Sequence, residues 1–145
     1  MRRRGRPVDQ NFEMDERLFY RLEDAYPVGS HPVGLSVRKP DFSVNREKHG
    51  GQPEYVLIPD WMHCGVAEFK CSDLPSELRS EGNVPYSWTV LHVPEDLNYH
   101  HSEVHTMKSG QNVHKQSQVS TLLYREFRQR LSESMLVIRC AETKE

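Results

Sequence analysis

Histidine side chains concentrate between residues 92 and 114, and their spacing fits two kinds of chemistry. If this segment is a strand, His101, Glu103 and His105 project from one face, because alternate residues of a strand share a face. Two imidazoles and one carboxylate can hold a divalent metal ion and leave a position open for water. Alternatively, His105 alone can act as a general acid or base, or bind an anion.

The same histidines also have a simpler interpretation. A helix would keep His101 and His105 on one face, four residues apart, but would move Glu103 away from them. The chain contains no HExxH or HxHxDH string, and histidines beside a turn are commonly exposed loop residues. The cofactor is therefore unknown, and a divalent metal is an option that the sequence does not favour.

A second group of chemically capable side chains lies in the segment 38–51, RKPDFSVNREKHGG. Basic and polar donors surround an aromatic ring there, a combination that can grip a phosphate, a nucleotide or a nucleic-acid backbone. The alternative is a polar loop that packs Phe42 and Val44 inward and leaves its other side chains in water. The candidate ligand-binding or anion-binding residues in this segment are Arg38, Ser43, Asn45 and Arg46.

The N-terminus, MRRRGRPVDQ, contains at residues 4–7 the Arg-Gly-Arg-Pro core of an AT-hook. In such a hook the glycine permits close approach, and the two guanidinium groups lie in the narrow minor groove of A/T-rich DNA. Acidic residues follow soon after, however, and a few phosphate contacts give only weak, salt-sensitive binding. The alternative is a solvated charged tail. The candidate nucleic-acid contacts are Arg2, Arg3, Arg4 and Arg6.

Composition bounds the class of protein. The 145 residues are most simply one domain, and a net charge of −2 means that any nucleic-acid contact needs a local basic patch. Three cysteines without a CxxC pair fit reduced thiols in a cytoplasm. No stretch approaches the roughly 18 apolar residues of a membrane span. We therefore expect a cytoplasmic protein without a membrane partner.

These residues need secondary structure to position them. Residue alternation and β-propensity predict strands in RLFYRLEDAY near the start, where a short helix is the alternative, and at 65–71, 84–93, 102–108 and 135–140. The clearest helix spans residues 116–134, because its apolar residues repeat along one face. Short helical segments are predicted at 53–61 and 72–82.

Residues 27–53 contain eight prolines and glycines, which argue against a long regular element. A loop of this length indicates a functional loop or a partner-binding surface. The predicted fold class is α+β, with a small mixed or antiparallel sheet of about five strands backed by the C-terminal helix. The predicted organisation is a flexible basic arm at 1–13 and a single α+β domain at 14–145.

Four short blocks, DERLFYRL, FSVNREK, GVAEF and SEVHTMKSG, occur in this order. The order resembles that of a group of small bacterial proteins of uncharacterised function, which carry Leu-Phe-Arg-Arg, Ser-Val-Asp-Arg, Gly-Val-Ala-Ser-Phe and Pro-Ala-His-Ala blocks. The resemblance covers most of residues 15–140 and supplies no activity. It implies that the matching positions are Arg21, Ser43, Asn45, Arg46 and His105, with Asn45 where the group has aspartate.

Three hypotheses of function result. The first is a cytoplasmic bacterial accessory module that binds a larger protein or nucleoprotein complex, in a defence or toxin system. The second is a small enzyme for a phosphate-bearing or nucleotide substrate, with His105 as acid, base or metal ligand and with Arg21, Arg38 and Arg46 gripping the anion. The third is auxiliary DNA or RNA binding through the N-terminal arm. The sequence leaves open whether any catalysis occurs.

Overall fold

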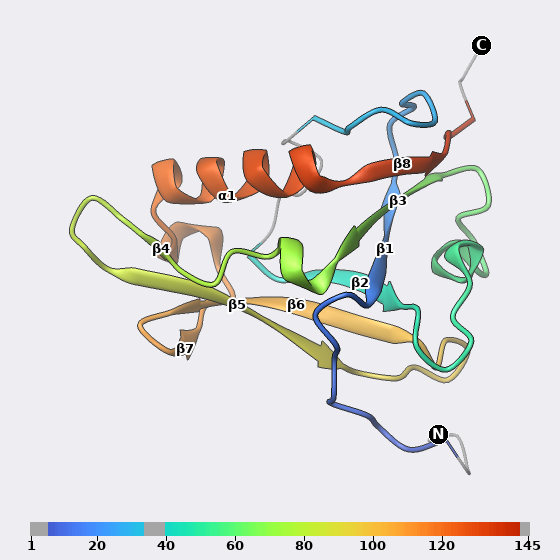
Figure 1. Cartoon of the computed structure of the whole chain (residues 1–145), viewed down its shortest axis with the longest axis horizontal. Helices are drawn as coiled ribbons and strands as arrows, with labels where there is room; N and C mark the ends of the chain where they lie inside the picture. The colour runs from blue at the N-terminus through green and yellow to red at the C-terminus, as the bar shows by residue number, and fades with distance from the viewer. Residues whose placement is uncertain (1–5, 34–39, 143–145) are drawn as a thin grey trace.

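The main feature of the fold is an antiparallel sheet that curls into a half-barrel beside an α-helix (Figure 1). A computed structural model of the chain describes residues 6–33 and 40–142. Within them the strand order is β4-β5-β6-β2-β1-β3-β8, and β7 pairs with β6. The strands are β1 (Arg17–Leu22), β2 (Phe42–Arg46), β3 (Gly65–Lys70), β4 (Leu78–Arg79), β5 (Pro85–His92), β6 (His101–Lys108), β7 (Gln111–Asn112) and β8 (Leu136–Arg139).

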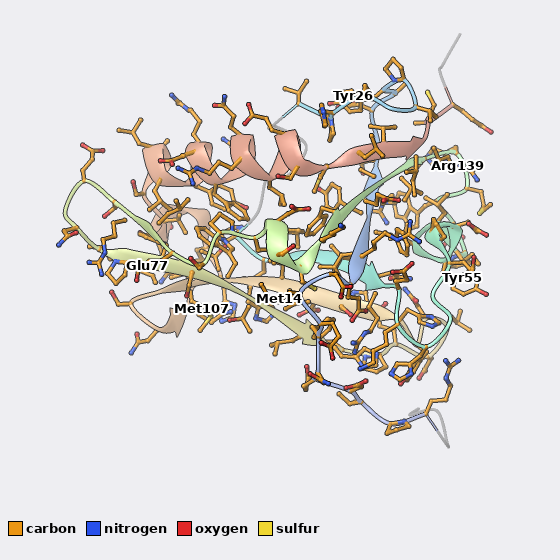
Figure 2. The ribbon with its side chains drawn as sticks, viewed as in Figure 1. Met14, Tyr26, Tyr55, Glu77, Met107 and Arg139 are labelled. Carbon is orange, nitrogen blue, oxygen red and sulfur yellow. The ribbon has the colours of Figure 1, made fainter. Side chains whose placement is uncertain are left out.

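The helix α1 (Thr121–Ser134) covers one face of this sheet and closes the main core. Its N-terminus is capped by Ser120, whose Oγ accepts a hydrogen bond from the backbone N–H of Leu123 at 3.3 Å. The ring of Phe127 stacks on Trp88 of β5, with centroids 4.1 Å apart. Side chains fill the space between α1 and the strands (Figure 2).

Strand alternation divides the polar and apolar residues between the two faces of the sheet. Along β6, Val104 points into the core beneath α1, whereas His101, Glu103 and His105 lie on the opposite face. A smaller apolar cluster covers part of that opposite face, beneath the 3₁₀ turn η2 (Pro53–Leu57). It consists of Phe19, Leu57, Cys64 and Val66, with Val56 and Ile138 packed against it.

The predicted fold class was wrong. The described chain is predominantly β, with eight strands in a curled antiparallel sheet instead of about five strands in a balanced α+β fold. The five predicted strands overlap β1, β3, β5, β6 and β8. The two-residue strands β4 and β7 are too short to give a periodic signal. β7 follows β6 through Ser109 and Gly110, whose positive φ angles of 52° and 81° suit a tight two-residue hairpin turn.

The missed strand β2 lies within the segment in which prolines and glycines argued against regular structure. Its first three residues do alternate, because Phe42 and Val44 are buried on the α1 face and the exposed Ser43 lies on the other. The predicted helix at 116–134 begins only at Thr121, after a 3₁₀ turn η4 (Gln116–Gln118). The predicted helix at 53–61 is the 3₁₀ turn η2, and the segment 72–82, also predicted to be helical, contains the strand β4.

In the described ranges, no helix combines the length and apolarity needed to cross a membrane.

The N-terminal segment 6–12, predicted to belong to a flexible arm, is hydrogen-bonded to the domain along one end of the sheet. The backbone N–H of Asp9 donates to Nδ1 of His92 at 2.9 Å, and the Gln10 side chain bonds both backbone groups of His92 at 2.8 and 3.0 Å. The Tyr99 hydroxyl donates to the carbonyl oxygen of Pro7 at 2.6 Å. These contacts fix residues 7–10 beside β5 and β6.

Candidate functional site: a cleft where two strands separate

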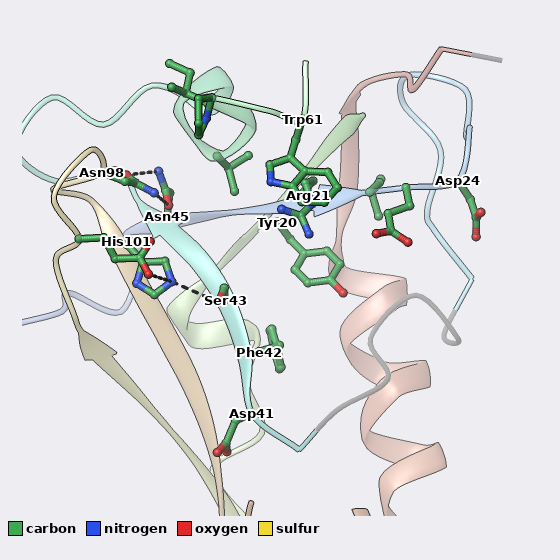
Figure 3. Close-up of a pocket in the computed structure, with 16 residues that line it drawn as sticks. Tyr20, Arg21, Asp24, Asp41, Phe42, Ser43, Asn45, Trp61, Asn98 and His101 are labelled. Carbon is green, nitrogen blue, oxygen red and sulfur yellow. Dashed lines mark hydrogen bonds and ion pairs between the residues drawn. The ribbon is translucent and has the colours of Figure 1, made fainter. Parts of the chain in front are cut away.

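A cavity of about 600 Å³ opens where β1 and β2 separate (Figure 3). The two strands are paired only at Leu18–Arg46 and Phe19–Asn45. Beyond these pairs each strand continues along its other neighbour, β1 along β3 and β2 along β6, so the sheet splits without losing either strand. We call this cavity the β1–β2 cleft. Its lining residues are Tyr20, Arg21, Leu22, Glu23, Asp24, Asp41, Phe42, Ser43, Asn45, Val56, Ile58, Pro59, Trp61, Glu95, Asn98 and His101.

Arg21 is the cationic group on the β1 side of the cleft. Its guanidinium carbon lies 3.9 Å from the centroid of the Trp61 ring, and Figure 3 shows the two side chains stacked at the cleft. Among the residues that the structure describes, none accepts a hydrogen bond or forms an ion pair with this guanidinium. The Trp61 ring therefore orients a planar group with five N–H donors that remain available to a ligand.

Ser43 and His101 form a hydrogen-bonded pair on the β2 side of the cleft. Nε2 of His101 lies 3.1 Å from Oγ of Ser43, and Nδ1 lies 2.8 Å from the carbonyl oxygen of Val93. A carbonyl oxygen can only accept, so Nδ1 carries the hydrogen and the neutral ring presents Nε2 as an acceptor to the serine hydroxyl. His101 is 8% exposed, whereas Ser43 is open to solvent.

Two asparagines join β2 to the β5–β6 connection at the floor of the cleft. Nδ2 of Asn45 donates to Oδ1 of Asn98, and Nδ2 of Asn98 donates to Oδ1 of Asn45, both at 2.8 Å. This reciprocal pair uses one hydrogen of each amide and leaves the second hydrogen of each for another acceptor. Asn45 is only 1% exposed, so the pair fixes the loop that carries Asn98 beside the strand.

Four carboxylates line the cleft, in different electrostatic situations. Asp41 is already engaged, because it accepts from the backbone N–H of Thr106 at 3.2 Å and lies 3.0 Å from Nδ1 of His114. Glu95 is largely exposed, with its Oε2 3.9 Å from Nε2 of His101. Glu23 and Asp24 are exposed at the β1 end. Among the described lining residues, one free guanidinium lies with these carboxylates, which suits a ligand with a single negative group better than a polyanion.

Exposed apolar side chains surround part of the cleft mouth. Ile58 and Trp61 line the cavity while remaining 46% and 37% exposed. Met62 follows Trp61 in the chain and is 47% exposed, and Leu97, between the lining residues Glu95 and Asn98, is 73% exposed. A polar floor with an exposed apolar margin is typical of a binding surface.

The structure brings together four of the residues that the sequence singled out. Arg21, Ser43, Asn45 and His101 all line the β1–β2 cleft. Arg46 does not, because it points to the α1 face, where its buried side chain pairs with Glu16 at 2.9 Å. Arg38 lies outside the described residues. The predicted anion grip of three arginines therefore contributes one described arginine, Arg21, to the cleft.

His105 and Glu103 share a sheet face with His101 but pair with each other away from the cleft lining. Nε2 of His105 lies 2.8 Å from Oε1 of Glu103, and Nδ1 lies 2.7 Å from Nδ2 of Asn112. Both ring nitrogens therefore face side chains of the protein outside the β1–β2 cleft, and a role of His105 as acid or base stays a prediction. Within residues 6–33 and 40–142, no three His, Cys, Asp or Glu side chains are placed to hold a metal ion.

The arginine-rich N-terminus is described only from Arg6 onward, so Arg2, Arg3 and Arg4 lie outside the described residues. The guanidinium carbon of Arg6 lies 3.9 Å from the centroid of the Tyr99 ring, at the end of the sheet. Arg6 is thus engaged with a ring of its own domain, and the third hypothesis, nucleic-acid binding through the arm, stays a prediction.

Sequence reasoning missed two residues that shape the cleft. Trp61 and Asn98 both lie in connections between strands, and their approach to β1 and β2 depends on long-range pairing. A signal for Trp61 existed, since a tryptophan in a polar turn-rich stretch is unusual.

No protein-family model, no curated protein and no solved structure matches this chain.

Proposed function

We propose that this protein is an interaction module that binds a short segment of a partner protein in the β1–β2 cleft. The observation that carries the proposal is the guanidinium of Arg21, held on Trp61 with no acceptor among the described residues. An arginine oriented in this way is suited to a carboxylate of the partner, from a side chain or a chain terminus.

The exposed apolar residues at the cleft support a protein segment as the ligand. Ile58, Trp61 and Leu97 offer surface for apolar side chains on either side of the carboxylate. Tryptophan and arginine are also the residue types that most often dominate binding energy at protein interfaces. The surrounding carboxylates disfavour a nucleic-acid backbone, which would bring several phosphates close to Glu23, Asp24 and Glu95.

The test uses two peptides that differ in one group, an acetylated and amidated Gly-Leu-Asp-Leu-Gly and its Asn counterpart. Nuclear magnetic resonance titration of the labelled protein detects even millimolar binding. We expect the Asp peptide to shift the indole N–H resonance of Trp61 and the amide of Ser43. Removing one charge-assisted hydrogen bond costs about 1.5–3 kcal/mol, so the Asn peptide should bind about tenfold more weakly or worse.

Arg21→Gln should remove the preference for the Asp peptide. Arg79→Gln is the matched control, because Arg79 is a solvent-exposed arginine on β4 that pairs with Glu77 and does not line the cleft. Equal binding of the two peptides, or shifts that persist in Arg21→Gln, would overturn the proposal. A DNA duplex that shifts the cleft resonances more strongly than either peptide would replace the protein partner with nucleic acid.

A further inference from the structure

We propose that Ser43 and His101 form a nucleophile–base pair, and that the β1–β2 cleft hydrolyses esters whose acyl group carries a carboxylate. The pair itself is independent of the proposed function, whereas the preference for a carboxylate rests on it, through Arg21.

The hydrogen bonds of His101 fix the direction of proton transfer. Its Nδ1–H donates to the carbonyl oxygen of Val93 at 2.8 Å, which leaves Nε2 to accept from Oγ of Ser43 at 3.1 Å. A nucleophile, a base in hydrogen-bond reach and a third group that orients the base are the arrangement of nucleophilic catalysis. Here the orienting group is a backbone carbonyl.

Two further features suit this pair to reaction with a ligand. Ser43 is exposed and lines the cavity, so an acyl carbon can reach its hydroxyl oxygen. The Oε2 of Glu95 lies 3.9 Å from Nε2 of His101, where its negative charge stabilises the imidazolium formed when the serine proton is transferred. The carboxylate is 60% exposed, so solvent weakens this support without removing it.

The register of β1 against β2 places Arg21 on the wall of the cleft opposite Ser43. The pairs Leu18–Arg46 and Phe19–Asn45 would continue to Arg21 opposite Ser43, on the same face as Phe19 and Asn45. The separation of β1 and β2 interrupts this pairing and leaves the cleft between the two side chains. A substrate carboxylate held by Arg21 therefore directs the other end of a short acyl chain toward Ser43.

The reaction needs only water as its second reactant. Oγ of Ser43 bonds to the ester carbonyl carbon while its proton passes to Nε2 of His101. The bond to the leaving oxygen then breaks, and the imidazolium gives its proton to that oxygen, releasing an alcohol. Water attacks the acyl-serine in the same way, and Ser43 leaves with the returned proton as the carboxylic acid departs. The unused amide hydrogen of Asn98, which the buried Asn45 holds in place, is a donor in the cleft for the carbonyl oxygen.

The test compares two activated esters, para-nitrophenyl acetate and the mono-para-nitrophenyl ester of succinic acid. Nitrophenolate release gives the rate, and intact-mass and peptide mass spectrometry locate the acyl group. We expect one acyl group on Ser43 and none in Ser43→Ala. His101→Gln, which keeps a donor for the Val93 carbonyl, should slow acylation by about 100-fold or more, because general-base assistance contributes about that much.

Matched variants separate the chemistry from binding and from folding. His105→Gln alters a histidine on the same strand and face outside the cleft lining and should leave the rate unchanged, as should Ser87→Ala on neighbouring β5. Arg21→Gln should slow only the succinyl ester, by about tenfold. Should Ser43→Ala not fold by circular dichroism, Ser43→Cys keeps a nucleophile in place and should carry the acyl group as a thioester.

Three outcomes contradict the inference in distinguishable ways. Acylation at lysines, with equal rates in wild type and Ser43→Ala, overturns the nucleophile. Equal rates in wild type and His101→Gln overturn the base. Acylation of Ser43 with no preference for the succinyl ester overturns the carboxylate anchor. If the Asp peptide still shifts the Trp61 indole in the first two cases, the partner-binding proposal stands and only the chemistry fails.

Discussion

The two ends of the β1–β2 strand pair use arginine in opposite ways. At the paired end, Arg46 is completely buried and ion-paired with Glu16 at 2.9 Å. At the separated end, Arg21 lies on Trp61 and none of the described residues accepts its hydrogen bonds. Both residues are arginines on the same pair of strands, Arg21 on β1 and Arg46 on β2. The acceptors around each guanidinium therefore decide whether it stabilises the fold or faces a ligand.

The paired end is closed because four of the five N–H groups of Arg46 donate to acceptors of its own domain. Nε and Nη2 donate to the two carboxylate oxygens of Glu16, at 3.0 and 2.9 Å. Two further N–H groups donate to the backbone carbonyl oxygens of Asp9 and Asn11, and the guanidinium carbon lies 3.9 Å from the Phe12 ring centroid. A buried charge is tolerated when it is paired and hydrogen-bonded, and here these bonds also tie the N-terminal segment to the sheet.

The largest effect should come from breaking this closed end. Arg46→Met leaves the Glu16 carboxylate buried without its cation and with only the backbone N–H of Lys48 donating to it, so we expect a loss of about 3–5 kcal/mol in the free energy of unfolding, measured by urea denaturation. Arg21→Met, the matched change at the open end, should cost only about 0.5–1 kcal/mol, the contribution of its contact with Trp61. Equal losses in the two variants would contradict the distinction between the two ends.

A double variant sharpens this first prediction. Adding Glu16→Leu to Arg46→Met removes the stranded carboxylate, so the double variant should be more stable than Arg46→Met alone. Hydrogen exchange at the Asp9 amide, which donates to His92, should increase in both variants because Arg46 no longer holds the N-terminal segment. Slow exchange at Asp9 in both would show that the segment is held without Arg46.

A smaller effect is expected from a glycine that packs against the same corner. A Cβ added to Gly51 would lie 2.1 Å from the carbonyl oxygen of Arg46 and 3.1 Å from Cδ2 of His100. Because the first of these is a backbone atom, the chain must move, and Gly51→Ala should cost about 1–3 kcal/mol in thermal or urea unfolding. Gly82→Ala, where the nearest atom is a side-chain methyl of Val84 at 3.9 Å, is the control that should change little.

The contrast between the two arginines also marks what the sequence can and cannot predict. Strand alternation in β1, β3, β5, β6 and β8 is a local property, so it is visible in the sequence. Alternation also places His101, Glu103 and His105 on one face correctly. Alternation cannot show which of these three side chains bonds to a residue of the neighbouring strand. That depends on β2, whose Ser43 is hydrogen-bonded to His101.

The balance of strands to helix was the part that local patterns misjudged. β2 is stabilised by pairing with β6 and β1, which overrides the prolines and glycines around it. The separate fates of Arg21 and Arg46 follow from the same pairing, since one-residue alternation places them on opposite faces of neighbouring strands. Residue type and spacing do not show that Arg46 is buried and that Arg21 lines the cleft until the register of β1 against β2 is known.

The smallest expected effect concerns pH and again belongs to the closed end. Burial lowers the pKa of His92 below its ordinary value of 6.5, although Nε2–H donates to the Tyr99 carbonyl, and burial lowers the pKa of His100 similarly. The charges of Arg46 and His49 also lower the pKa of His92, whereas the charge of Asp9 raises it.

A depressed pKa in the folded state means that the unfolded chain takes up protons first as the pH falls. The free energy of unfolding should therefore be fully present above pH 6.5 and decline as the pH drops from there toward the lowered pKa values. Protonation of His92 also removes the acceptor for the Asp9 amide, so exchange at that amide should increase over the same range. Urea denaturation between about pH 8 and pH 5 measures the decline, and His92→Gln should make it shallower. His114→Gln, at an imidazole that is 72% exposed, should leave the slope as it is; a slope that depends on His114 instead would place the pH sensitivity outside the closed end.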